Sequence, residues 1–157
     1  QGHAPDHATF WSRDDELVIG GDQLLATISP NLGVYATEPG ADPVGEWLES
    51  CAGFQPHARE AQLVLPGHKL PFTGLVTRMD QLIENHESAL DRLERFLIEP
   101  RTAADCFQTL FKRQIGDGEY GLALVEAVAH CLHLWHAGRV TRVRRADGAW
   151  IWQAKEA

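Results

Sequence analysis

Three short segments of this chain each place a histidine or an aspartate directly beside a short apolar run that predicts a strand. Residues 2–7 (Gly-His-Ala-Pro-Asp-His) precede one such run, residues 20–22 (Gly-Gly-Asp) follow another, and residues 66–68 (Pro-Gly-His) follow a third. Strand ends hold side chains rigidly, and neighbouring glycines let a ligand approach the backbone. The pattern therefore predicts a polar site built on strand ends.

The elements expected around these segments run in the order strand, strand, helix, strand, helix. Residues 8–11 and 16–19 predict a β-hairpin, and residues 62–65 a third strand. Pro43 suits the first position of a helix that runs to about residue 54. Apolar residues at steps of three and four predict a long amphipathic helix from about residue 73 to residue 97. This order is typical of a layered α/β unit.

The loop expected over residues 26–43 is rich in proline and glycine and has no sustained hydrophobic period. Loops of this length inside a compact domain are usually functional. Ser29, Asn31 and Tyr35 lie on it and are candidates for substrate contacts. The alternative is a loop that packs on its own Leu32 and Tyr35.

Beyond residue 100 the expected order changes to helix, helix and a two-stranded hairpin. Thr102 suits the cap of a short helix to about residue 111, with Asp105 at the third position. A second helix is expected over residues 119–137, with Leu122 and Trp135 facing inward. Asp-Gly at residues 147–148 is a strong hairpin signal.

Charge is distributed unevenly along the chain. Residues 1–99 hold 6 Lys and Arg against 16 Asp and Glu, a net charge of −10, whereas residues 100–157 hold 8 against 6, a net charge of +2. The change in balance supports two domains, 1–99 and 100–157. The fold class we predict is mixed α/β, with a small winged-helix-like α+β domain at the end.

His7, Asp22 and His68 are the candidate metal ligands among the three segments. Imidazole and carboxylate groups together suit zinc, manganese or iron(II). A lone histidine beside a strand is usually structural, and a lone Gly-Asp after a strand is often a turn. The three segments in this order are much more specific than any one of them.

In order and spacing, these segments resemble the third, fourth and fifth metal motifs of the metallo-β-lactamase superfamily, which includes glyoxalase-II-like and ribonuclease-like members. The resemblance covers residues 1 to about 99 and implies half of an αββα sandwich. It implies that His7 binds a first metal, that Asp22 bridges two metals and that His68 binds the second. His3 would then be a supporting residue, and no catalytic residue is expected beyond the metal ligands.

The superfamily's main signature, His-x-His-x-Asp-His, is absent from the sequence. His130, His133 and His136 lie far downstream with no carboxylate at matching spacing, which favours surface or interface histidines over a metal site. Residue 1 is Gln, and Met79 is the only methionine. We therefore expect the C-terminal part of a longer protein, whose missing N-terminal half is its partner and without which the chain is inactive and binds metal weakly or not at all.

For the intact parent, the resemblance implies a metal-dependent hydrolase with two divalent ions, zinc by default and manganese or iron as alternatives. A metal-bound hydroxide would act on an ester, thioester, lactone or phosphodiester of a small-molecule substrate. His86, on the apolar stripe of the long helix, is a further candidate for substrate contact. The alternative for His86 is a core histidine with satisfied hydrogen bonds.

Residues from about 100 to 154 resemble the small winged-helix domain that follows many metallo-β-lactamase domains. Arg139, Arg142, Arg144 and Arg145 cluster at the expected wing beside tryptophans, a combination that can bind nucleic acid. One alternative is therefore a metallo-β-lactamase-fold ribonuclease or nucleic-acid-binding protein. Others are a solvated sheet edge, or a module that only packs or forms a homodimer. The net charge of −8 argues against nucleic-acid binding over the whole surface.

Three further features bear on the compartment. The cysteines Cys51, Cys106 and Cys131 form no Cys-x-x-Cys pair, so reduced, buried thiols are expected. No apolar run is long enough for a membrane span, and no secretory signal begins the chain. Cytoplasmic location with no membrane partner is the default expectation.

Overall fold

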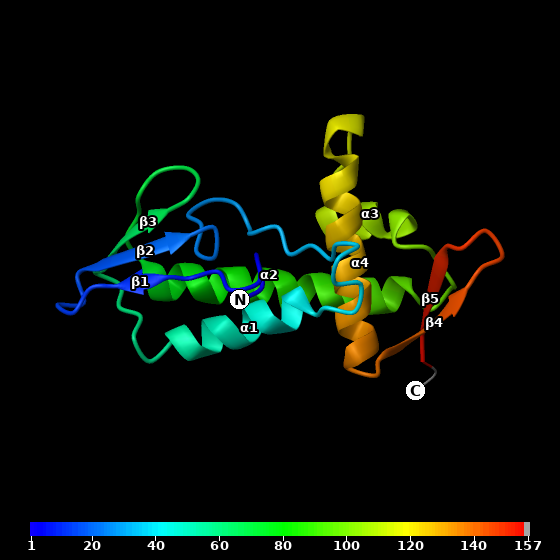
Figure 1. The fold of residues 1–157 in the computed structure, drawn as a ribbon, viewed down its shortest axis with the longest axis horizontal. Coiled ribbons are helices and arrows are strands. Elements are labelled where there is room, and N and C mark those ends of the chain that lie inside the picture. The colour runs from blue at the N-terminus through cyan, green and yellow to red at the C-terminus, as the bar shows by residue number, and fades with distance from the viewer. Residues whose placement is uncertain (156–157) are drawn as a thin grey trace. The chain divides into compact units, whose positions relative to one another are not determined.

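The computed structural model describes residues 1–155. Its helices and strands follow the expected order, and the mixed α/β class is confirmed (Figure 1). The elements are β1 (Phe10–Trp11), β2 (Leu17–Gly21), α1 (Pro43–Phe54), β3 (Leu63–Pro66), α2 (Leu75–Phe96), η1 (Ala104–Cys106), α3 (Phe107–Phe111), η2 (Asp117–Glu119), α4 (Tyr120–His136), β4 (Val140–Arg144) and β5 (Trp150–Ala154). Within the described part, no helix has both the length and the apolar composition needed to cross a bilayer.

The chain divides into two compact units. Unit 1 comprises residues 1–32 and 45–85, and unit 2 comprises residues 33–44 and the chain from residue 86 onward. Helix α2 contributes its first half to unit 1 and its second half to unit 2. The predicted division at residues 99 and 100 is a different partition, and it stays a prediction.

Unit 1 contains a three-stranded sheet in the order β1-β2-β3. Strand β1 pairs antiparallel with β2, which confirms the predicted hairpin. Strand β2 pairs parallel with β3, and its register places Gly21 opposite Pro66. Because these two strands point the same way, the segments that follow them emerge at the same edge of the sheet.

One face of this sheet is buried and the other is exposed. Val18 of β2 and Val64 of β3 are fully buried, as are the side chains from α1 and α2 in the same core, among them Trp47, Leu75, Met79 and Leu82. On the opposite face, Phe10, Ile19 and Leu63 are 64%, 46% and 43% exposed. Central parallel strands are usually covered on both faces, so this apolar face is incompletely covered within residues 1–155.

In unit 2, the second half of α2 and helix α4 contribute small and apolar side chains to a common core. Ala123, Ala127, His130 and Leu134 of α4 are buried at steps of four, three and four. The predicted inward face was wrong at Leu122 and Trp135, which are 58% and 37% exposed. The buried stripe passes through alanines, whose small side chains let neighbouring segments approach the helix closely.

Local signals beyond residue 100 set the ends of several elements. Thr102 and Asp105 form reciprocal hydrogen bonds, with Asp105 Oδ2 accepting from the Thr102 amide at 2.8 Å and Thr102 Oγ1 accepting from the Asp105 amide at 3.4 Å. The predicted capping box is thus confirmed, although a 3₁₀ turn, η1, precedes α3. Gly148 has φ +92° in the turn between the antiparallel strands β4 and β5.

Candidate metal centre in unit 1

Asp22 lies just beyond the end of β2, and two histidines approach its carboxylate. His68 follows β3 and places Nδ1 2.6 Å from Oδ1 of Asp22. His3, from the segment before β1, places Nε2 3.3 Å from Oδ2. The parallel pairing of β2 with β3 explains how residues 46 positions apart meet here. The three predicted strand-end segments therefore converge on one carboxylate.

The His3 ring is held in a defined orientation. Its Nδ1 lies 3.0 Å from the carbonyl oxygen of Asn31. A carbonyl oxygen only accepts hydrogen bonds, so Nδ1 carries a proton and Nε2 is the ring nitrogen that faces Asp22. The contact between Nε2 and the carboxylate is favourable when a proton or a metal cation lies between them.

His7 contacts the backbone of Asp22. Its Nε2 accepts a hydrogen bond from the backbone amide of Asp22 at 3.3 Å. Burial, with the nearby charge of His3, lowers the pKa of His7, which keeps this ring neutral and able to accept. In the structure His3 contacts the Asp22 carboxylate and His7 contacts the Asp22 backbone amide. The ligand role of His7 stays a prediction.

Two glycines make this close packing feasible. A Cβ on Gly21, whose φ is +53°, would lie 2.6 Å from Cε1 of His7. A Cβ on Gly67 would collide with the carboxylate of Asp22. The amide of Gly67 donates a hydrogen bond to the carbonyl of Gly21 at 2.8 Å, which ties the two strand ends together. The Gly-Gly-Asp and Pro-Gly-His segments therefore depend on their glycines for space.

Comparison with known proteins identifies the family of the chain. Residues 90–155 match the family model described as metallo-beta-lactamase-like, C-terminal domain. A beta-lactamase domain protein from Burkholderia ambifaria has a solved structure that matches 98% of this chain and 46% of its own, with 35% identity and a TM-score of 0.91. The chain belongs to the metallo-β-lactamase superfamily.

Two further relatives show the same partial overlap. A metallo-beta-lactamase family protein from Thermus thermophilus is 27% identical, with a TM-score of 0.82, over 98% of this chain and 47% of its own. "Probable metallo-hydrolase YqjP" of Bacillus subtilis (strain 168) is 26% identical over 133 residues, which are 82% of this chain and 41% of that protein. The chain therefore spans less than half the length of these relatives.

The cluster around Asp22 does not by itself form a complete metal site. Within residues 1–155, no three His, Cys, Asp or Glu side chains are arranged so that they could hold a metal ion on their own. The Asp22 carboxylate is 23% exposed and the His68 side chain 66% exposed. The predicted ligands Asp22 and His68 are adjacent, and sequence reasoning missed the approach of His3.

The predicted substrate-contact residues are divided between the two units. Ser29 and Asn31 lie in unit 1. Ser29 is exposed, and the backbone carbonyl of Asn31 is hydrogen-bonded to His3. Tyr35 is 53% exposed and His86 is buried, both in unit 2. Of the two residues in the alternative packing of the loop, Leu32 is fully buried and Tyr35 is exposed.

The histidines of α4 have separate partners. His130 is buried and stacks on His86, with ring centroids 5.6 Å apart. His133 Nδ1 lies 3.0 Å from Oδ1 of Asp42, and His136 Nε2 lies 3.0 Å from the carbonyl oxygen of Gly40. Their side chains therefore serve packing and hydrogen bonding inside unit 2. All three cysteines are free and buried, as expected.

Three of the four wing arginines are engaged within unit 2. Arg139 pairs with Asp91 and Glu94, and Arg145 pairs with Asp147. The Arg142 guanidinium lies over three tryptophan rings, 4.1 Å from the centroid of Trp135, 4.5 Å from Trp150 and 5.6 Å from Trp152. Arg144 is exposed and has a weak hydrogen bond to the Gly148 carbonyl.

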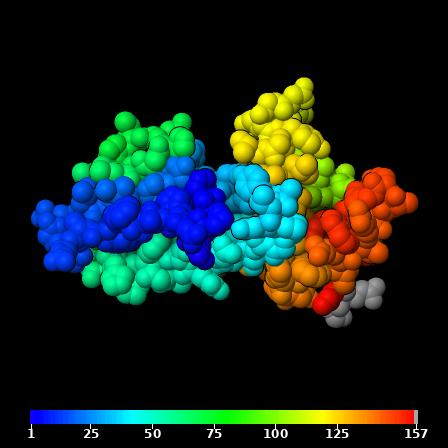
Figure 2. Space-filling model, viewed as in Figure 1, coloured from blue at the N-terminus to red at the C-terminus, as the bar shows by residue number. Residues whose placement is uncertain are grey.

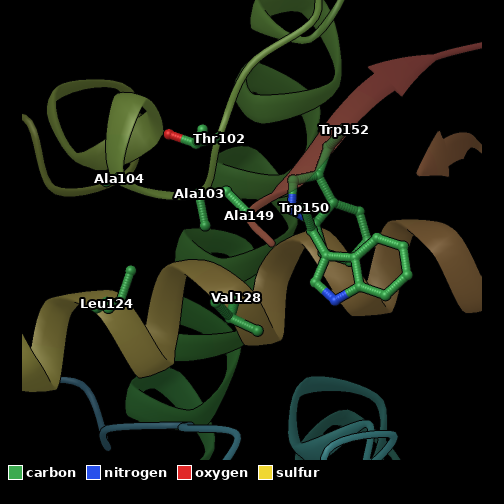
Figure 3. A pocket seen from close by; sticks show the side chains of 8 residues that line it. All are labelled: Thr102, Ala103, Ala104, Leu124, Val128, Ala149, Trp150 and Trp152. Atoms are coloured by element: carbon green, nitrogen blue, oxygen red, sulfur yellow. The ribbon is translucent and has the colours of Figure 1, made fainter. Parts of the chain in front are cut away.

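An apolar hollow of about 300 Å³ lies beside this wing. Figure 3 shows Leu124 and Val128 on α4 facing Ala103, with Trp150 and Trp152 of β5 closing one side. Trp152 is almost fully buried, whereas Trp150 is 42% exposed. Trp150 and Trp152, which the sequence suggested as contacts for nucleic-acid bases, thus line an apolar pocket and lie under the Arg142 guanidinium.

Proposed function

We propose that this chain carries one part of the metal site of a metal-dependent hydrolase of the metallo-β-lactamase superfamily. The observation that supports this most directly is the position of His3 Nε2, 3.3 Å from the Asp22 carboxylate, with the other ring nitrogen held by the Asn31 carbonyl. Metal-bound histidines characteristically donate their other ring N–H to a carbonyl or carboxylate in this way.

The chemical types of the donors suit a divalent ion, and ligands outside residues 1–155 would have to complete the site. His3, Asp22 and His68 offer two imidazoles and a carboxylate, a set suited to zinc, with manganese and iron(II) as alternatives. His3 takes the ligand role that the sequence assigned to His7, while His7 holds the Asp22 backbone. When bound, such an ion supplies a hydroxide near neutral pH and polarises a carbonyl or phosphoryl oxygen. The proposed substrates are an ester, thioester, lactone or phosphodiester.

The chain's own residues provide position and charge. Asp22 supplies negative charge that can be shared between two ions, and the parallel strands hold it beside His68. The partner that we propose is the rest of the metallo-β-lactamase sandwich, which would supply the remaining ligands. The exposed apolar face of Phe10, Ile19 and Leu63 supports that partner, because a second layer would bury it and complete an αββα arrangement.

The nucleic-acid alternative has less support than the hydrolase. Phosphate binding requires cations that are free to face the nucleic acid, and three of the four wing arginines are already paired or stacked within unit 2. The order α3, α4, β4, β5 in unit 2 supports a winged-helix-like module that packs against other protein surfaces. Both the winged-helix character and a homodimer stay predictions.

Zinc titration by calorimetry tests the proposed function, with Asp22→Asn as the variant and Asp80→Asn, an exposed helix position, as the matched control. We expect the protein in its natural length to bind zinc, D80N to match it, and D22N to bind at least about 100-fold more weakly. Hydrolysis of p-nitrophenyl acetate, a thioester and bis(p-nitrophenyl) phosphate by the same samples identifies the reaction. Equal zinc affinity in D22N and D80N would overturn the proposal.

A further inference from the structure

A second hollow lies in unit 1 on the same two segments that form the metal centre. It has a volume of about 540 Å³ and is lined by Ala26, Thr27, Lys69, Leu70, Pro71 and Phe72. One wall begins four residues after Asp22, and the other begins directly after His68. The segment of the second wall follows β3 in Figure 1 and forms part of the surface in Figure 2 (green). The hollow is thus connected through the backbone to both side chains of the centre.

Both walls are fixed from behind. Phe72 forms an antiparallel bridge with Val64 of β3, with hydrogen bonds of 2.8 and 3.1 Å in both directions. On the other wall, the guanidinium of Arg78 donates to the carbonyls of Leu25 and Ile28, at 2.9 and 3.1 Å. A pocket with preformed walls loses less conformational freedom when a ligand binds.

The lining of the hollow is chiefly carbon. Leu70 is 79% exposed, the largest exposure among the large apolar side chains of residues 1–155. Phe72 and Pro71 continue the apolar surface into the hollow. Ligand sites combine such apolar walls with a few polar groups that fix orientation. The walls therefore favour the hydrocarbon part of a small molecule.

Lys69 provides the one charged group of the lining. Its backbone has φ +71°, a conformation that is unusual for a residue with a Cβ and costs free energy. No ion pair or hydrogen bond joins its side chain to another group of residues 1–155. A strained, exposed ammonium directly after His68 and at the rim of an apolar hollow is therefore available to an anion.

We propose that this hollow binds the apolar part of the substrate and that Lys69 binds an anionic group on it. The inference rests on the proposed hydrolase and narrows its substrate class. The substrate would be an ester, thioester or lactone that joins an apolar acyl or aryl portion to a negatively charged group. Lys69 is then a specificity-determining residue, and Leu70 sets the affinity for the apolar portion.

Binding to the metal-free chain tests this without any turnover. Hexanoate, hexan-1-ol and acetate are titrated separately into ¹⁵N-labelled protein, and amide shifts are followed by NMR. Lys69→Gln removes the charge at nearly constant length. Lys112→Gln is the matched control, because Lys112 is also exposed and also has a positive φ, 55°, but lies in unit 2. Leu70→Ser removes apolar surface from an exposed position.

We expect hexanoate to shift the amides of Thr27, Leu70 and Phe72 more than acetate does. K69Q should weaken hexanoate binding about three- to fivefold, as expected for a solvent-exposed ion pair, and leave hexan-1-ol binding unchanged. L70S should weaken both ligands, and K112Q neither. Equal effects of K69Q and K112Q, or hexanoate shifts confined to other segments, would overturn the inference.

The same samples separate this inference from the proposed function. Zinc titration of the natural-length protein reports on the Asp22 centre and does not involve Lys69. Hexanoate binding with no zinc binding would overturn the hydrolase and leave a ligand site at the hollow. Zinc binding with no hexanoate shifts would overturn the hollow and leave the hydrolase standing.

Discussion

The two units use the same side chain, histidine, in opposite ways. In unit 1, His3 and His68 are partly exposed and both approach the carboxylate of Asp22. In unit 2, His86 and His130 are 4% and 2% exposed and stack on each other. The first pair faces a negative charge and solvent, and the second faces the apolar core formed by α2 and α4.

This difference shows that the surroundings of a histidine decide its chemistry. The Asn31 carbonyl holds one ring nitrogen of His3 so that the other faces the Asp22 carboxylate, an arrangement that is typical of metal ligands. Burial makes the charged form of His86 and His130 unfavourable. The sequence placed His3 and His68 in strand-end segments and His86 on the apolar stripe of a helix, but it did not show which side chains each ring contacts.

The largest expected effect is a loss of stability in mild acid, which would distinguish the buried histidines from the others. Burial, with a smaller effect of His130, lowers the pKa of His86 to about 3. Burial also lowers the pKa of His130 to about 4, and its hydrogen bond to the Glu126 carbonyl opposes this only in part. Unfolded histidine has a pKa near 6.5. Between these values the unfolded state binds more protons, so the free energy of unfolding falls as pH drops below about 6.5, by several kcal/mol in total.

Urea denaturation of the metal-free chain at pH 7, 6 and 5 measures this loss. The His86→Met variant keeps the volume but cannot titrate, so its stability should fall with decreasing pH by about one proton less, or about 1.4 kcal/mol per pH unit, in the steepest region. His57→Met, at an exposed position, is the matched control and should behave as the unmodified chain does. Identical pH dependence in H86M and H57M would mean that the buried pair is not what sets the acid response.

Smaller effects are expected when His7 and His3 of unit 1 are each replaced by alanine. His7→Ala leaves the Asp22 amide without its acceptor, so we expect the free energy of unfolding to fall by about 1–3 kcal/mol. His3→Ala removes no such bond to the Asp22 backbone, so stability should change less while zinc affinity falls at least about tenfold. Urea denaturation without metal and zinc titration of the natural-length protein measure the two quantities. If H7A weakened zinc binding and left stability intact, His7 would be the ligand, as the sequence resemblance implied.

The smallest effect concerns the arginines of unit 2. Arg142→Ala removes the guanidinium that lies over the rings of Trp135 and Trp150. It should lower the free energy of unfolding by about 1 kcal/mol, which would appear as a lower Tm in a thermal melt. Arg144→Ala, on the same strand and exposed, should leave the Tm unchanged. The same two variants can be tested for RNA binding at low salt, where we expect no binding from the parent chain. Salt-sensitive RNA binding that Arg144→Ala abolishes would show that the wing serves nucleic acid after all.

Much of the fold could be predicted from local sequence signals. The hairpin of β1 and β2, the start of α1 at Pro43, and the Thr102–Asp105 box each depend on residues close together in the chain. The amphipathic stripe of α2 was predicted equally well, because its period is a property of one segment. The convergence of the three strand-end segments followed from family resemblance, and the contacts of Asp22 bear out their proximity.

The rest depended on contacts that no local pattern encodes. His3 and His7 both lie on a segment with no regular structure, so only the folded chain decides which ring reaches the carboxylate and which reaches the amide. The buried face of α4 was misjudged at Leu122 because alanines, which carry little hydrophobic signal, form the stripe. Pro-Gly-His was a visible signal at the metal centre, whereas the positive φ of Lys69 had none.

The pairing of β2 with β3 has a consequence for the order of folding. These strands are parallel and are separated by 41 residues, which include α1, whereas β4 and β5 form an antiparallel hairpin across a short turn. Closing a long loop carries a larger entropic penalty and slows the formation of the contacts it brings together. We therefore expect Asp22 and His68 to come together after the β4–β5 hairpin has formed. Opening of β3 would separate them, so amide hydrogen exchange in β3 is expected to report on how long this contact persists.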